Sequence, residues 1–233
     1  MPIKKIGFSH GALHKVADKY LESTINVYKK CSNDVIEVFV KDFNEADKLL
    51  KIAPYIKNFL YRSIHLPTDI NYKKDEQIVK LLDSAVAFYK EINADYILIH
   101  PDRVDNWEIF DKYKVSWAVE NMDKGKKGYK TVEEFISFFD KKPSWKLVLD
   151  LNHCYTNDKT MKLADDMIEN FKDRIVRIHL SGCKEDHDPI FQTKQNFILD
   201  YCNKVDVPIV IESIFDNVDD VKKEYNYIKK YLK

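Results

Sequence analysis

The chain is poor in several features that mark whole classes of protein. Only five of its 233 residues are glycine. The segment FSHGALH (8–14) lacks the glycine spacing of a dinucleotide-binding turn. No stretch approaches the roughly 20 apolar residues of a membrane span, and the N-terminus has no apolar run long enough for a signal peptide. These absences argue against a doubly wound nucleotide-binding sheet and predict no membrane partner.

The chain also has few cysteines and no excess of charge of either sign. Cys31, Cys154, Cys183 and Cys202 show no CxxC spacing, which is typical of reduced thiols and predicts a cytoplasmic protein. Thirty-eight basic residues balance 38 acidic ones, so no overall basic field indicates nucleic-acid binding.

What the chain does contain is a repeat of short apolar runs, whose starts are about one βα unit apart. The segments between them have helical periodicity, clearly so at 75–92, 164–173 and 217–233, whereas the helix expected at 104–112 is short. The sequence therefore predicts an α/β protein, a single (β/α)8 TIM barrel over residues 1–233. The eight predicted strands are 3–8, 35–40, 61–66, 94–100, 115–120, 145–150, 174–180 and 207–212.

Histidines and carboxylates are concentrated at the ends of these predicted strands. In a TIM barrel the active site forms at the C-terminal strand ends, so we expect these side chains to meet at one mouth of the barrel. Of the seven histidines, only His14 is expected inside a helix. The residues at or just past a strand end are His10, His65, His100, Glu120, Asp150, His153, His179, His187 and Glu212.

A metal site explains this joint pattern better than separate structural roles. A lone strand-end histidine is more often a hydrogen-bonded structural residue. Several carboxylates and histidines at one mouth, however, would repel and desolvate one another unless cations lay between them. Imidazole together with carboxylate suits zinc, manganese or iron better than magnesium or calcium.

With these residues placed, the chain resembles the xylose-isomerase-like barrels, and within them the endonuclease IV branch (AP endonuclease family 2). The similarity extends from the first strand to the last. The motifs that carry it are HLPTDIN (65–71), LIHPD (98–102), ENMDKGKKGYKTVEEF (120–135), DLNH (150–153), RIHLSG (177–182) and IES (211–213).

The resemblance implies a site for up to three zinc ions, with Glu120 and Glu212 in catalytic roles. Both carboxylates would bridge and orient the ions, and Glu212 would also assist the nucleophile. The family has Asp-x-His where this chain reads Glu185-Asp186-His187, so either Glu185 or Asp186 would ligate. The implied ligands are His65, His100, Glu120, Asp150, His153, His179, Glu185, His187 and Glu212.

Three classes of function remain open at this point. The first is a metal-dependent phosphodiester hydrolase, acting on abasic DNA or on a smaller phosphate ester. The second is a sugar or sugar-phosphate isomerase or epimerase, which needs one divalent metal and two carboxylates to move a proton. The third is a non-catalytic barrel with a structural metal site, which is disfavoured because such sites are usually closed and four-coordinate. The histidines beyond a Glu-Asp-His-Glu set favour several metals and hence the hydrolase.

The resemblance is weaker in the loops with which the family binds DNA. The family places an aromatic residue and a leucine after its third strand, where this chain has Thr68 and Asp69. The loop after the second strand is basic in the family, but here it reads KDFNEAD (41–47). Acidic side chains at these places would repel phosphates, so the DNA-gripping loops are predicted to be weaker than the metal site.

Overall fold

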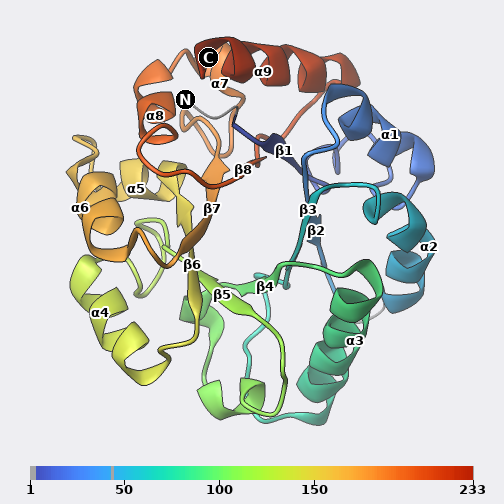
Figure 1. The fold of residues 1–233 in the computed structure, drawn as a ribbon, viewed down its shortest axis with the longest axis vertical. Coiled ribbons are helices and arrows are strands. Elements are labelled where there is room, and N and C mark those ends of the chain that lie inside the picture. Colours follow the sequence, from blue (N-terminus) through green and yellow to red (C-terminus); the bar gives the residue numbers. More distant parts are fainter. Residues whose placement is uncertain (1–3, 43–44, 233) are drawn as a thin grey trace.

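Parallel strands close into a barrel surrounded by helices (Figure 1). The computed structural model describes residues 4–42 and 45–232. Each strand pairs in parallel with the next along the chain, and β8 returns to pair with β1, where Phe8 lies opposite Ile211. The strands are β1 (Ile6–Ser9), β2 (Val35–Phe39), β3 (Tyr61–His65), β4 (Tyr96–Ile99), β5 (Trp117–Glu120), β6 (Lys146–Asp150), β7 (Ile175–Leu180) and β8 (Ile209–Ile211).

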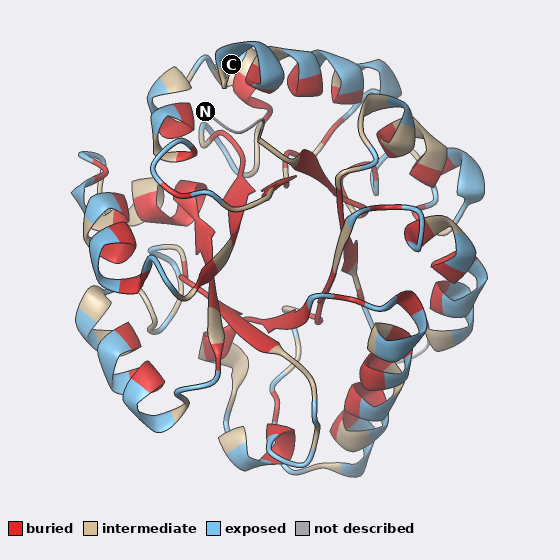
Figure 2. Cartoon of the chain, viewed as in Figure 1, coloured by how far each residue is buried: buried red, intermediate tan, exposed pale blue. Residues whose placement is uncertain are grey.

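This architecture confirms the predicted fold class, and each strand overlaps the apolar run that predicted it. Residue 3 of the first predicted strand lies outside the described residues. The strands are buried almost throughout because the barrel interior covers one face and the helices cover the other (Figure 2).

Amphipathic helices form the outer layer, with their buried sides against the strands (Figure 2). Local capping fixes several of them. The Asp75 side chain accepts from Gln77 N at the start of α3, and Thr131 and Glu134 form a capping box at the start of α4. The helices are α1 (Glu22–Cys31), α2 (Ala46–Ile56), α3 (Glu76–Ile92), α4 (Val132–Lys141), α5 (Leu151–Asn157), α6 (Lys162–Phe171), α7 (Ile190–Thr193), α8 (Asn196–Tyr201) and α9 (Val218–Tyr231). None in the described part of the chain has both the length and the apolar composition needed to cross a bilayer.

The connection between β4 and β5 carries only the short 3-10 helices η1 (Pro101–Arg103) and η2 (Trp107–Phe110), as the sequence predicted. Aromatic rings pack at this place. Trp107 and Trp145 have ring centroids 5.2 Å apart, and Trp145 stacks on Trp117 at 5.6 Å. Large aromatic side chains bury much apolar area per residue, so they cover the barrel where a full helix is missing.

Two histidines differ from their predicted local structure. His14 lies in a series of turns after β1, and His153 lies in the first turn of α5. The helix expected at His14 is therefore not formed. At residue 153 the chain passes directly from β6 into a helix, because Asp150 is both the last strand residue and the N-cap of α5.

Candidate metal centre

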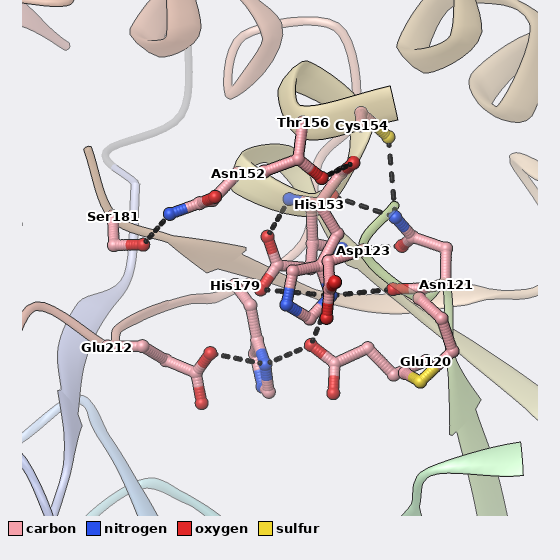
Figure 3. Close-up of polar contacts among 12 residues, drawn as sticks. Glu120, Asn121, Asp123, Asn152, His153, Cys154, Thr156, His179, Ser181 and Glu212 are labelled. Carbon is pink, nitrogen blue, oxygen red and sulfur yellow. Dashed lines mark hydrogen bonds and ion pairs between the residues drawn. The ribbon is translucent and has the colours of Figure 1, made fainter. Parts of the chain in front are cut away.

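The ends of β5 to β8 bring three carboxylates around one histidine. His179 Nδ1 lies 3.0 Å from Glu120 Oε1 and 3.1 Å from Glu212 Oε2, and Figure 3 shows the imidazole between these two side chains. Asp150 lies opposite His179 in the pairing of β6 with β7. The ligand atoms of Glu120, Asp150, His179 and Glu212 all lie within 4.8 Å of one another. This Glu-Asp-His-Glu group could hold one divalent ion.

A second group shares Glu120 with the first. His65 from β3 and His100, just past β4, direct their Nε2 atoms at Glu120 Oε2, at 3.5 and 3.1 Å. The Nδ1–H of His65 donates to the carbonyl of Leu66 at 2.8 Å, which leaves Nε2 free to act as a ligand. His65, His100 and Glu120 could therefore hold a second ion next to the first.

The buried polar atoms of both groups fit bound cations. Glu120 Oε2 and Asp150 Oδ2 are buried and have no hydrogen-bond partner among the described residues. Unpaired polar atoms of this kind are costly in a folded protein. Imidazole nitrogens beside carboxylate oxygens suit zinc, manganese or iron, so the donor set matches the ions that the sequence predicted.

The electrostatics show how tightly the groups are coupled. The pKa of Asp150 is raised to about 6, chiefly by burial and also by the neighbouring Glu120 and Glu212, against the opposing effect of His153. Burial alone would lower the pKa of His179, but Glu212, Glu37 and Glu120 raise it well above its usual value. A divalent ion would take over the charge compensation that His179 otherwise provides.

Asn121 connects the ends of β5 and β6 and so positions the ligands. Its side-chain amide donates to the carbonyl of Asp150 at 2.9 Å and accepts from the Asp150 N–H at 2.7 Å. Its own carbonyl accepts from His153 Nδ1–H at 2.7 Å, while Asp150 Oδ1 accepts from the His153 N–H at 2.8 Å. The sequence showed Asn121 only as part of the Glu-Asn motif, because a hydrogen bond between two strands leaves no local pattern.

Replacing Asn121 by alanine is expected to lower the free energy of unfolding by about 1–3 kcal/mol, because two buried backbone groups of Asp150 lose their partner. Urea denaturation of the two proteins measures this. Asn170→Ala is the matched control, since its amide makes an exposed hydrogen bond to Asp166 O. Equal losses in both variants would contradict the role of Asn121.

The remaining predicted ligands do not form a third compact group among the described residues. His153 Nδ1 lies 3.7 Å from Glu120 Oε1, and the rings of His153 and His187 are 5.9 Å apart. His187 Nδ1 lies 3.0 Å from Ser181 Oγ. The exposed Glu185 lines a neighbouring surface pocket but not the cavity that Glu120 lines, whereas His153, Asp186 and His187 line both. The site of a third ion therefore stays a prediction.

Glu37 is a site-forming residue that the sequence analysis missed. It lies in the middle of β2, is fully buried, and its Oε1 is 3.0 Å from His179 Nε2. One available signal was the acidic residue inside the otherwise apolar run VIEVFV (35–40), since an unpaired buried charge is rare. By contrast His10 joins neither group, because its Nδ1 accepts from Phe39 N at 2.9 Å.

A cavity of about 360 Å³ opens over the two candidate ligand groups. Its volume is in the range of small-molecule sites. Its wall includes Thr68, one of the two residues that stand where the endonuclease IV family has an aromatic residue and a leucine. In the acidic loop after β2, Glu45 is buried, lies 3.5 Å from Lys19 Nζ and accepts from the Lys41 N–H. The charge of Glu45 is therefore compensated, so this carboxylate repels phosphate less than the sequence suggested; residues 43–44 of the predicted loop lie outside the described residues.

No protein-family model and no curated protein matches this chain, but solved structures match it over nearly its whole length. Endonuclease IV from Thermus thermophilus matches with a TM-score of 0.71 and 13% identity, covering 98% of each chain. The AsfvAP:AG structure matches at 0.69 and 14%, covering 99% of each chain. The 3-keto-D-glucoside 4-epimerase YcjR from E. coli matches at 0.67 and 10%, covering 97% of this chain and 99% of that one. The chain thus has a (β/α)8 TIM-barrel fold, which it shares with proteins named for different reactions.

Proposed function

We propose that this protein is a metal-dependent hydrolase of phosphodiesters, with zinc as the first candidate metal. The observation that carries the proposal is the second ligand group: His65 and His100 meet Glu120 through the carboxylate oxygen that does not contact His179 Nδ1. A sugar isomerase or epimerase needs only the Glu-Asp-His-Glu group, so it leaves these two histidines without a role.

The charge of the site supports the same choice. Three carboxylates around one divalent ion leave a net negative charge, which suits a neutral sugar. Counted over the three ligand carboxylates, a second divalent ion held by His65 and His100 changes the net charge from negative to positive, because neutral histidines add ligands without negative charge. A positive site attracts the anionic phosphodiester and stabilises the charge that develops when it is cleaved.

When bound, such ions supply Lewis acidity and activate water at neutral pH. The chain contributes the placement of the reacting groups. Glu120 ties the two ligand groups together, and the capping bond to α5 fixes Asp150. Glu212, whose side chain is 15% exposed, lines the cavity and can accept a proton from the attacking water.

His100→Ala is expected to remove one equivalent of tightly bound metal per chain and to lower phosphodiester hydrolysis by at least about 10²-fold, the scale of losing one electrostatic stabiliser. Metal content measured by plasma mass spectrometry and hydrolysis of bis(p-nitrophenyl) phosphate test this, with an abasic-site oligonucleotide as the second substrate. His14→Ala is the control, because His14 is exposed at the cavity rim and belongs to neither group. A wild-type protein that binds a single ion and hydrolyses neither substrate would contradict the proposal.

The second candidate is a sugar or sugar-phosphate isomerase or epimerase. It is favoured by the placement of Glu120 and Glu212 on either side of His179 (Figure 3), since two opposed carboxylates can remove and return a proton. Proton exchange from solvent water into ketoses, followed by NMR in the presence of Mn²⁺, would reveal this activity. In that case His100→Ala would leave the exchange rate nearly unchanged.

A further inference from the structure

A buried carboxylate that neither candidate reaction uses lies next to the candidate metal centre. Glu37 projects into the barrel from β2, where it meets side chains of β3, β4 and β7. It is fully buried. A buried carboxylate is retained in a folded protein only when partners compensate its charge, so its contacts indicate what it does.

The two oxygens of Glu37 have different partners. Oε2 accepts from Ser63 Oγ at 2.7 Å and from the Tyr96 hydroxyl at 3.2 Å. Oε1 forms an ion-pair contact with His179 Nε2 at 3.0 Å, and neither of these two atoms has a hydrogen-bond partner among the described residues. One oxygen is thus anchored to the barrel wall, and the other faces the back of a candidate metal ligand.

A second set of contacts holds this anchor in place. The fully buried Arg177 donates from Nε to the Tyr96 hydroxyl at 3.1 Å and from Nη2 to Asp95 at 3.1 Å. Arg177 precedes His179 by two positions on β7, so both side chains point to the same side of the strand. A continuous line of polar contacts therefore runs from Asp95 through the barrel interior to Glu37.

The two nitrogens of His179 consequently face different environments. Nδ1 lies among the carboxylates of the metal centre, between Glu120 and Glu212, whereas Nε2 faces Glu37. A histidine that ligates through one ring nitrogen carries its proton on the other, and the acceptor of that proton fixes the tautomer and the ring orientation.

We propose that Glu37 is a positioning residue that accepts the Nε2 proton of His179 and so holds Nδ1 toward the metal ion. The proposal rests on the metal centre of the proposed function but not on the reaction catalysed there. Tyr96, Ser63 and Arg177 act by keeping the Glu37 carboxylate in place.

Direct ligation is the competing role for Glu37, because its carboxylate also lies within 4.8 Å of ligand atoms of His65 and Glu212. The contacts favour positioning. Oε2 already accepts two hydrogen bonds, and Oε1 lies against His179. The two roles predict different metal stoichiometries, which makes them separable by experiment.

The test compares zinc binding by the wild type with that of Glu37→Gln and Tyr96→Phe, by titration against a chromophoric chelator. Glutamine has nearly the shape of glutamate but lacks its charge, so Glu37→Gln is expected to weaken zinc binding by about 10–100-fold at unchanged stoichiometry. The visible absorption of the Co²⁺-loaded protein is expected to change as well, because the orientation of a ligand changes. Tyr96→Phe removes one of the two hydrogen bonds to Oε2 and is expected to act in the same direction with a smaller effect.

Tyr28→Phe is the matched control for a purely structural loss. Its buried hydroxyl donates to His10 O and accepts from Leu13 N, and it touches no candidate ligand. It is expected to lower the melting temperature while leaving zinc affinity and the Co²⁺ spectrum unchanged. Equal zinc affinity of Glu37→Gln and wild type would overturn the positioning role alone, as would loss of a whole metal equivalent, which would make Glu37 a ligand. A wild type that binds no metal would overturn the metal centre, and this inference with it.

Discussion

Replacing Glu120 by glutamine is expected to remove metal binding and catalytic activity together. Glu120 is the one residue common to the two ligand groups, with Oε1 directed at His179 and Oε2 at His65 and His100. An amide offers one weak oxygen ligand and no charge, so neither ion keeps its full set of ligands. The loss of activity should exceed the roughly 10–100-fold that changing a residue behind a ligand produces.

Metal content after dialysis and the rate of bis(p-nitrophenyl) phosphate hydrolysis measure the effect of Glu120→Gln. Glu169→Gln makes the same chemical change on the exposed side of α6 and should retain wild-type metal content and rate. If Glu120→Gln kept both metal equivalents, the shared-ligand arrangement would be wrong. Because His100→Ala should remove only one equivalent, the two variants together distinguish a shared ligand from two independent sites.

Gly7→Ala is expected to prevent the barrel from closing. A β-carbon at Gly7 would lie 1.8 Å from Val35 O and 2.5 Å from Val35 C, both of them backbone atoms of β2. Overpacking usually costs about 1–3 kcal/mol because side chains can move aside. Here only a shift of one strand against its neighbour relieves the overlap, so the loss of stability should exceed that range and the variant should express largely as insoluble protein.

Gly11→Ala is the matched control for Gly7→Ala, because a β-carbon at Gly11 would meet its nearest neighbour, Phe39 Cβ, at 3.6 Å, an ordinary contact. Its melting temperature and circular dichroism spectrum should match those of the wild type. A soluble Gly7→Ala protein of near-native stability would show that β1 and β2 do not approach as closely as the structure places them.

The stability of β1 and the chemistry of the site are linked through the same strands. Gly7 pairs with Val35, and two positions later Ser9 pairs with Glu37. A displacement of β1 would therefore disturb the strand that carries Glu37. The close approach of β1 to β2 at Gly7 explains why glycine occupies this strand interior, although glycine normally weakens a strand.

The sequence by itself determined the barrel and most of the candidate ligands at its strand ends. Apolar runs and helical periodicity are local signals, and barrel closure places every strand end at the same mouth. His65, His100, Glu120 and Asp150 could therefore be assigned to one region before any distance was known. The short helix between β4 and β5 was likewise predictable, because too few residues separate those strands.

Only the tertiary structure decided which of these side chains meet and what stands behind them. It divided the ligands into two groups that share Glu120, and it did not gather His153, Glu185 and His187 into a third. It also showed the roles of Glu37 and Asn121, whose partners lie on other strands. The physical reason is that strand periodicity fixes the face on which a side chain lies, whereas contacts across the barrel depend on how all the strands are arranged around it.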